Sequence, residues 1–538
     1  MLRVGISIFC LVFLANLSNV LAQSNTAEPS PTEAESDWAQ YYAKEITAEE
    51  LKEHLMILAS DEYEGRETGF PGQKRAADYI QNYFSELGVA PCVDGSYYQT
   101  YPLRRIDQSK AALRLNGKDL EYIQDYYFFP GFSLDELKAG EIVLAGYGIS
   151  HEDWNDYKDL DVKDKVVLVL PGEPKDKEGN YILGVGPDQT SEWSGDFRVK
   201  REAAMKAGAK ALIMINTDYN SYIGRIKNFL LNPPMRLDME REERQDVLPV
   251  LFFPSNAAND LLAKTKLKSL EKWEKRMFKK QRSFSATLDI DIQFEMNAIN
   301  EALTAENVLC FIEGSDPELK DEIVVITAHY DHVGIINGEI HNGADDDGSG
   351  TVAALEIAES FVKAKQDGHG PRRSVLIMTV SGEEKGLLGS EWYADHPVFP
   401  LENTIVDLNI DMIGRVDPAH EADSNYVYLI GSDRLSTELH EISEKCNGEY
   451  TELDLDYTFN AEDDPNRFYY RSDHYNFAKN GIPCIFYFSG VHEDYHKPTD
   501  TPEKIMYEKT AVITRLVFHT AWQIANQDKT IEVDVTER

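Results

Sequence analysis

Apolar and polar residues follow two different patterns along this chain, and each pattern predicts a different kind of structure. From about residue 297 onward, short continuous apolar runs alternate with longer segments of helical period. Such runs are typical of strands that are buried on both faces, as in an open α/β sheet. The predicted strands cover 323–327, 374–380, 404–410, 426–430 and 483–488, and a last helix covers about 508–526.

The segment before residue 120 carries clear helix boundaries. Thr47 and Glu50 form a capping box that opens a helix extending to about Ser60. Pro71 begins a second helix, which is expected to stop at Gly88. We assign residues 41–119 and 291–530 to one α/β domain.

Residues 120–290 have a different texture, in which short β-like runs alternate with loops. Strand-like runs cover 141–148, 165–170, 211–215 and 248–253, and one helix is predicted over 198–207. This block contains only His151 of the chain's 13 histidines. We interpret it as an inserted β-rich domain that carries no catalytic chemistry of its own.

The N-terminus has the pattern of a secretory signal peptide. Arg3 supplies a positive charge, an apolar run follows, and Val20-Leu21-Ala22 is a small-residue cleavage site. Residues 1–22 are therefore expected to be removed, leaving an exported protein that is periplasmic or extracellular and has no membrane span. Residues 23–40, rich in Ser, Thr, Pro and Glu, are predicted to be a disordered leader.

The charge balance excludes some classes of partner. With 54 basic and 93 acidic residues, the net charge of −39 disfavours nucleic acids and anionic membranes, which both attract basic surfaces. The four cysteines after residue 22 have no CxxC spacing, which argues against a cysteine zinc site. Cys310 and Cys484 lie in apolar runs and are predicted to be buried free thiols.

Candidate metal ligands cluster where the predicted strands end. These residues are His329, the acidic loop Asp345–Asp347, the pair Glu383 and Glu384, Asp411, and His496. Imidazole and carboxylate ligands without thiolates suit zinc, with manganese and cobalt as alternatives. The number of carboxylates exceeds what one ion needs, which predicts two ions that share a bridging aspartate.

Two other metal motifs are matched only in part. The loop from Asp345 to Glu356 approaches the spacing of a calcium-binding EF-hand, but a strand and turn precede it where a helix is required. His492 to His496 matches HExxH, but Gly490 and Pro498 leave no room for the helix that this motif needs.

His329 and His332 are close in sequence, and either could be the metal ligand. We prefer His329 over His332 as the ligand, because Asp331 is then spaced to orient its ring. His341 and His474 are interpreted as ordinary polar loop residues.

Five segments taken together resemble the co-catalytic zinc aminopeptidases, a family that includes glutamate carboxypeptidases and transferrin-receptor-like proteins. They are His329-Tyr330-Asp331, Gly343 to Gly350, Gly382 to Ser390, Asn409 to Met412, and Tyr495-His496. The insert resembles a protease-associated domain, and the Gly65–Gly69 loop resembles the family's N-terminal signature. The resemblance implies a mixed-sheet α/β zinc-exopeptidase sandwich, of the phosphorylase/hydrolase-like kind, with helices on both faces.

The resemblance also implies a role for each residue. His329 and Asp411 are expected on one zinc ion, Glu384 and His496 on the other, and Asp346 between them, with Asp345 and Asp347 as alternatives for the bridge. Glu383 takes the position of the general base. Asp331 is expected to orient His329, and Tyr495 to donate a hydrogen bond to the oxyanion of the transition state.

The function that follows is hydrolysis of N-terminal residues from peptides by an exported aminopeptidase with two zinc ions. One alternative is a carboxypeptidase, which needs a basic cluster for the substrate's terminal carboxylate; Arg467 and Arg471 are the candidates. The other is a receptor-like binding protein without activity, which the full set of ligands disfavours.

Overall fold

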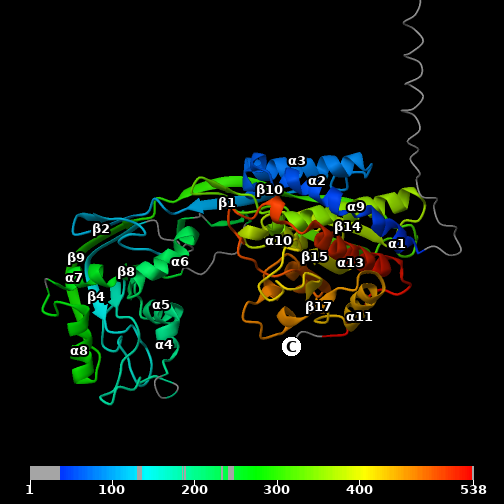
Figure 1. Cartoon of the computed structure of the whole chain (residues 1–538). Helices are drawn as coiled ribbons and strands as arrows, with labels where there is room; N and C mark the ends of the chain where they lie inside the picture. The colour runs from blue at the N-terminus through cyan, green and yellow to red at the C-terminus, as the bar shows by residue number, and fades with distance from the viewer. Residues whose placement is uncertain are drawn as a thin grey trace, which may run out of the picture.

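The computed structural model describes residues 37–129, 136–184, 186, 189–231, 234–239, 247–263 and 265–535. Two bodies lie side by side in Figure 1, joined by the long paired strands β1 and β10. The predicted signal peptide, and the leader up to residue 36, lie outside the described residues. Among the described helices, none is long and apolar enough to cross a bilayer.

The larger body is built on a mixed nine-stranded sheet with the order β17-β16-β18-β15-β11-β14-β10-β1-β7. Strand β11 pairs in parallel with both β14 and β15, and β15 pairs in parallel with β18. Strands β1, β7 and β10 extend the sheet in antiparallel fashion. The strands are β1 (Tyr98–Asp107), β7 (Met235–Leu237), β10 (Ile299–Ile312), β11 (Ile323–His329), β14 (Ser374–Val380), β15 (Thr404–Ile410), β16 (Tyr426–Ile430), β17 (Asp454–Asp456) and β18 (Cys484–Phe488).

Helices cover both faces of this sheet, which confirms the predicted fold class. The largest core cluster lies on one face, where six helices pack on residues such as Val324 and Ile326. The opposite face packs Val325 and Met378 against two helices. The first group is α1 (Trp38–Tyr42), α2 (Ala48–Leu58), α3 (Pro71–Glu86), α9 (Gly350–Gln366), α11 (Thr437–Cys446) and α13 (Tyr507–Asn526), and the second is α10 (Leu388–Asp395) and α12 (His474–Ala478).

The predicted helix boundaries of the N-terminal part are confirmed. The Thr47 hydroxyl accepts a hydrogen bond from the Glu50 amide at 3.1 Å and caps α2. Helix α3 begins at Pro71 and ends just before Gly88, which has φ +81°. The predicted disorder of residues 37–40 is wrong, because Asp37 caps α1 and the Trp38 ring stacks on His369.

The second body contains a seven-stranded sheet with the order β3-β2-β9-β4-β5-β6-β8. It spans Ala112 to Glu295, so it begins before and ends after the predicted boundaries of 120 and 290. Its strands are β2 (Ala112–Leu115), β3 (Lys118–Leu120), β4 (Glu136–Ala145), β5 (Val166–Val169), β6 (Ala211–Asn216), β8 (Val250–Pro254) and β9 (Ser285–Glu295). Its assignment as a protease-associated domain remains a prediction.

This body is less purely β than the sequence pattern suggested. Five helices accompany the sheet: α4 (Glu192–Gly195), α5 (Phe197–Lys206), α6 (Tyr219–Leu231), α7 (Ser255–Ala263) and α8 (Leu270–Lys280). In α8 only Trp273 and Met277 are buried, among Lys, Glu and Arg residues. The two buried residues of this helix lie four positions apart and form a narrow apolar stripe. Such a stripe indicates a helix less clearly than the continuous apolar runs indicate strands.

Strand β7 comes from within this second segment but pairs with β1 of the main sheet. Met235 and Leu237 are buried there beside Leu103 and Leu388. The second body is therefore attached through three strands of one sheet.

Candidate metal centre

The candidate site lies where three parallel strands of the main sheet end. His329 is the last residue of β11, the central strand of the three, and Asp411 directly follows β15. Glu383 and Glu384 follow β14 after two intervening residues. Carboxyl ends of adjacent parallel strands meet at one edge of a sheet, which brings these side chains together.

Two groups of potential ligand atoms are formed at this edge. The His496 cluster contains His332, Asp346, Glu384 and His496, and the His329 cluster contains His329, Glu383 and Asp411. Within each cluster the ligand atoms all lie within 4.8 Å of one another. These are the two groups of this kind among the described residues.

Asp346 lies between the two clusters. Its Oδ1 atom is 3.4 Å from His329 Nε2, and its Oδ2 atom is 2.9 Å from His496 Nε2. His329 Nε2 is in turn 3.7 Å from Asp411 Oδ1, and His496 Nε2 is 3.1 Å from Glu384 Oε1. The two oxygens of one carboxylate therefore face the two clusters, as a bridging ligand requires.

Buried polar atoms without hydrogen bonds converge here. In the described part of the chain they include Asp346 Oδ2, Glu384 Oε1, His496 Nε2 and both ring nitrogens of His332. A buried polar atom without a partner is costly, so this concentration fits a site built to hold cations. Imidazole nitrogens and carboxylate oxygens are ligands that suit zinc.

The two neighbouring glutamates have opposite electrostatic environments. Burial, with Glu384 and Asp411 nearby, raises the pKa of Glu383 well above its ordinary value despite His329. For Glu384, burial and Asp346 favour the neutral acid, but His496 and His332 outweigh them and lower its pKa to about 2. The sequence places these residues side by side, whereas the fold turns them toward different clusters.

Asp345 and Asp347, the alternatives for the bridge, have other partners. Asp347 accepts hydrogen bonds from the backbone amides of His329 at 3.2 Å, Gly350 at 2.8 Å and Met412 at 3.0 Å. Asp345 accepts one from the Gly414 amide at 2.6 Å and contacts His492 at 3.1 Å. Both carboxylates tie loops together, and only Asp346 faces both clusters.

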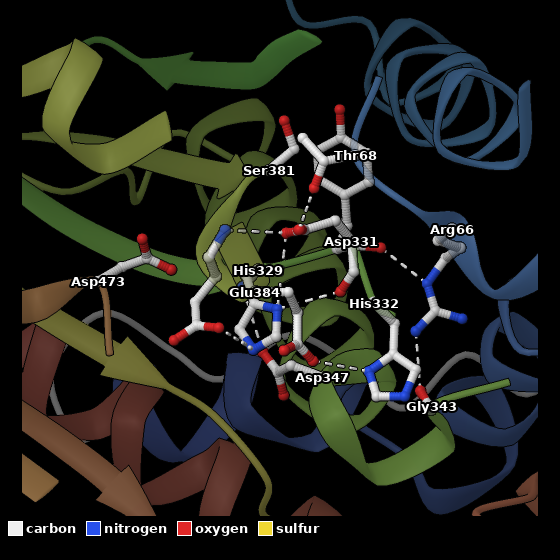
Figure 2. A network of polar contacts seen from close by, with 12 residues as sticks. Arg66, Thr68, His329, Asp331, His332, Gly343, Asp347, Ser381, Glu384 and Asp473 are labelled. Atoms are coloured by element: carbon white, nitrogen blue, oxygen red, sulfur yellow. Dashed lines mark hydrogen bonds and ion pairs between the residues drawn. The ribbon is translucent and has the colours of Figure 1, made fainter. Parts of the chain in front are cut away.

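His332, which the sequence ranked below His329, also belongs to the site. It is fully buried, and its Nδ1 atom is 3.0 Å from Glu384 Oε1 (Figure 2). The same atom is 3.7 Å from Asp346 Oδ2. The loop approaches it closely: a Cβ on Gly343, which has φ +54°, would lie 2.4 Å from the His332 ring. The two histidines therefore enter different clusters and are not alternatives for one position.

Asp331 contacts His329 differently from the expectation. Its backbone carbonyl lies 3.1 Å from His329 Nδ1, whereas its carboxylate is 3.7 Å away. The carboxylate instead accepts hydrogen bonds from the Thr68 hydroxyl at 2.5 Å and the Glu383 amide at 3.3 Å. It thus connects the N-terminal loop to the loop that carries Glu383.

Arg66 was not identified as a site residue from the sequence. It is 1% exposed, and its guanidinium donates to the carbonyls of Tyr330 at 2.7 Å, Asn342 at 2.7 Å, Gly343 at 2.8 Å and Leu58 at 2.9 Å. Figure 2 shows the bond to Gly343. The sequence offered one indication of its role: Arg66 is the single basic residue in loop 65–69, and Gly65 and Gly69 at the ends of that loop allow it to lie close to other backbone segments.

Tyr495 lies beside the clusters, in the wall of a pocket. Its ring stacks on the His496 ring with centroids 3.9 Å apart, and burial raises the pKa of its hydroxyl. The pocket is lined by Asp346, Glu383, Asp411, Met412, Phe468, Arg471, Phe486, Phe488, Val491 and Tyr495. The cavity opens directly onto the candidate metal ligands.

The partial motifs do not form their own sites. A strand, β13 (Glu339–His341), precedes the acidic loop, so the entering helix of an EF-hand is absent from this described stretch. The HExxH segment forms turns, and of its two histidines only His496 joins a cluster. The interpretation of His474 as a polar loop residue is wrong: it begins α12, is fully buried, and stacks on Phe486 because the strand beneath it is aromatic.

Comparisons with known proteins agree with this arrangement. Residues 307–521 match peptidase family M28. The chain is 26% identical to aminopeptidase Y of Saccharomyces cerevisiae over 253 residues, which are 44% of this chain and 42% of that protein. It is 29% identical to aminopeptidase YwaD of Bacillus subtilis over 215 residues, which are 39% of this chain and 42% of that protein. The matched regions thus span less than half of these relatives.

Similarity to solved structures extends over most of the chain. The aminopeptidase from Aneurinibacillus sp. strain AM-1 aligns with 93% of this chain and 100% of its own, with a TM-score of 0.55 and 19% identity. At this level of identity the likeness concerns the fold. The match over 307–521, which contains every candidate ligand, identifies this part of the chain as a peptidase family M28 domain, and the similarity to zinc aminopeptidases agrees with it.

Proposed function

We propose that this protein is an exported aminopeptidase that holds two zinc ions and removes N-terminal residues from peptides. The observation that carries the proposal is the pair of ligand clusters that share Asp346. The aminopeptidase relatives support the same reaction class.

Each cluster supplies ligands for one ion. His329 and Asp411 are proposed for the first, Glu384 and His496 for the second, and Asp346 for both. Bound zinc would supply Lewis acidity to the scissile carbonyl and to a water nucleophile. The additional imidazole, His332, lies 3.0 Å from Glu384 Oε1 and belongs to the same cluster.

Glu383 is proposed as the general base. Its Oε2 atom is 4.0 Å from His329 Nε2, and the side chain lines the pocket in which a substrate would lie. From this place it can accept a proton from water and pass it to the leaving amine. Its backbone is positioned by Asp331, and Tyr495 is proposed to donate to the oxyanion.

The second body is proposed to be a protease-associated domain that shapes access to the site. Neither ligand cluster contains a residue from it. Substitutions on its loops are therefore expected to change KM or the preferred peptide length, while zinc content stays constant. A loss of zinc on replacing His151 would contradict this role.

The test of the mechanism compares three glutamate-to-glutamine variants. Glu383→Gln should fold, retain zinc and lose at least about a hundredfold in kcat. Glu384→Gln should lose zinc affinity as well as activity. Glu493→Gln is the matched control, since this residue would be the base only if the HExxH segment were the catalytic motif.

Two outcomes would refute the assignment. One is near-normal kcat for Glu383→Gln, and the other is inactivation by Glu493→Gln. The amino- and carboxypeptidase alternatives are separated by comparing free aminoacyl, N-blocked and C-terminal glutamyl peptides, each with and without a chelator. Binding of peptides without any turnover, unchanged by a chelator, would favour the receptor-like alternative.

Export is tested by N-terminal sequencing of the mature protein. The expected first residue is Gln23, directly after the predicted cleavage site. Intact Met1 on protein recovered outside the cytoplasm would contradict the proposal.

A further inference from the structure

The pocket beside the candidate metal centre has an apolar wall with one cation. Aromatic side chains of Phe468, Phe486, Phe488 and Tyr495 form most of this wall, completed by Met412 and Val491. The three carboxylates of the lining, Asp346, Glu383 and Asp411, all belong to the ligand clusters. Arg471 remains as the cation among the lining residues.

The Arg471 guanidinium has no polar partner among the described residues, unlike those of Arg415 and Arg434. Arg415 forms an ion pair with Asp494 at 3.1 Å, and Arg434 donates to the backbone carbonyls of Asn460 and Ala461. The guanidinium of Arg471 lies 4.9 Å from the centroid of the Phe468 ring, and no carboxylate among the described residues pairs with it. Its five N–H donors are therefore available to a ligand.

This combination fits a side chain with a short apolar stem and a terminal carboxylate. An apolar stem can pack against the aromatic wall, and the planar guanidinium can bind both oxygens of a carboxylate at once. A lysine or arginine side chain in the same place would be repelled. We propose that Arg471 is a specificity-determining residue that selects peptides with an N-terminal glutamate or aspartate.

This inference rests on the proposed aminopeptidase function and concerns the substrate class of the same site. A carboxylate at Arg471 could also come from the C-terminus of a dipeptide. The two sources share one chemistry, so the experiment must separate them.

The first experiment measures kcat/KM for glutamyl, glutaminyl, leucyl and lysyl anilides, which have no C-terminal carboxylate. The wild type is expected to prefer glutamyl over glutaminyl by at least about tenfold, because a charge-assisted bond is lost with the amide. Arg471→Met should abolish this ratio and leave the glutaminyl and leucyl rates within about twofold.

Arg467→Met is the matched control. Arg467 is four residues away and also lies over an aromatic ring, that of Tyr470 with the centroid at 4.8 Å, but it does not line this pocket. This variant should keep the wild-type ratio. A wild-type ratio at or below one, or equal loss of the ratio in both variants, would overturn the proposal.

The second experiment separates the side chain from the chain terminus. Gln-Ala and its C-terminal amide are compared in wild type and Arg471→Met. Equal rates for the two support recognition of the N-terminal side chain, whereas an Arg471-dependent preference for the free acid overturns it in favour of C-terminal recognition.

A binding measurement keeps the inference separate from the reaction. Calorimetry with L-glutamate and L-glutamine on the zinc-loaded protein needs no turnover. If no aminoacyl substrate is cleaved but glutamate binds through Arg471, the aminopeptidase assignment fails and the pocket assignment stands. Glutamate binding that is unchanged in Arg471→Met refutes the pocket assignment alone.

Discussion

Replacing Arg66 tests whether one buried cation holds the candidate metal centre together. Arg66→Met keeps most of the side-chain volume and removes every hydrogen-bond donor. The change leaves the carbonyls of Leu58, Tyr330, Asn342 and Gly343 without this partner. Two of these carbonyls flank the clusters: Tyr330 follows His329, and Gly343 opens the loop that carries Asp346.

The expected loss of stability is large. The Gly343 carbonyl still accepts a hydrogen bond from the Gly348 amide. Leaving one buried acceptor unpaired costs about 1–3 kcal/mol, so the other three acceptors give about 3 kcal/mol or more. Burial itself opposes the charge on Arg66 and lowers its pKa, but Asp331, Asp500 and Asp346 oppose this effect. Removing the cation therefore also leaves a surplus of negative charge around the site. A natural domain is stable by only about 5–15 kcal/mol in total.

The assay is urea unfolding at fixed zinc concentration, combined with a zinc competition titration. Arg66→Met should lower the free energy of unfolding by about 3 kcal/mol or more and weaken zinc binding by about ten- to a hundredfold. Arg66→Lys should give losses of stability and zinc affinity between those of the wild type and Arg66→Met, since one ammonium cannot reach four carbonyls. Arg75→Met is the control, because Arg75 forms a half-exposed ion pair with Glu64, worth about 1 kcal/mol at most. Equal effects of Arg66→Met and Arg75→Met would refute the reasoning.

Three further predictions concern zinc, Thr68 and Glu356. Chelation should abolish activity, and about two equivalents of zinc per chain should restore it; full restoration by one equivalent, or by calcium, would contradict two shared sites. Thr68→Val removes the hydroxyl that donates to Asp331 and should reduce kcat about tenfold without lowering zinc content; an unchanged kcat would show that this bond positions nothing. Burial raises the pKa of Glu356 from 4.5 to about 7, against the opposing effect of His54, so the folded state loses stability as pH rises from about 4.5 to about 7. Glu356→Gln should remove that loss, which is at most about 3 kcal/mol, and parallel pH–stability curves for variant and wild type would refute it.

The catalytic sheet was predictable because its strands are continuous apolar runs. Residues 374–380 and 404–410 were predicted with the boundaries that β14 and β15 have. A run of this kind is buried on both faces, so the strand can be recognised without knowing its pairing register or its neighbouring strand. Helix α8 was missed for the opposite reason, since its two buried residues lie among charges.

The candidate site was predictable in its residue types and only partly in its geometry. Spacing alone could not show which of Asp345, Asp346 and Asp347 is the bridging ligand. The answer depends on the folded loop, in which the other two carboxylates accept hydrogen bonds from backbone amides. The same limit applies to His332, whose ring faces Glu384 only after the loop at Gly343 has folded over it. The partners of Arg66 are carbonyls, which carry no side-chain signature in a sequence.

The paired strands β1 and β10 also determine how the second body could be inserted into such a chain or deleted from it. Asp107 lies opposite Ile299 in their register, so the segment between them leaves and re-enters the sheet at neighbouring points. A two-residue hairpin turn could join these ends and excise the entire second body in one step. The cost of that deletion falls on β1, which would lose β7 and become an edge strand with its hydrogen-bonding groups exposed. An engineered minimal peptidase would therefore need charged or proline substitutions along that edge to remain monomeric.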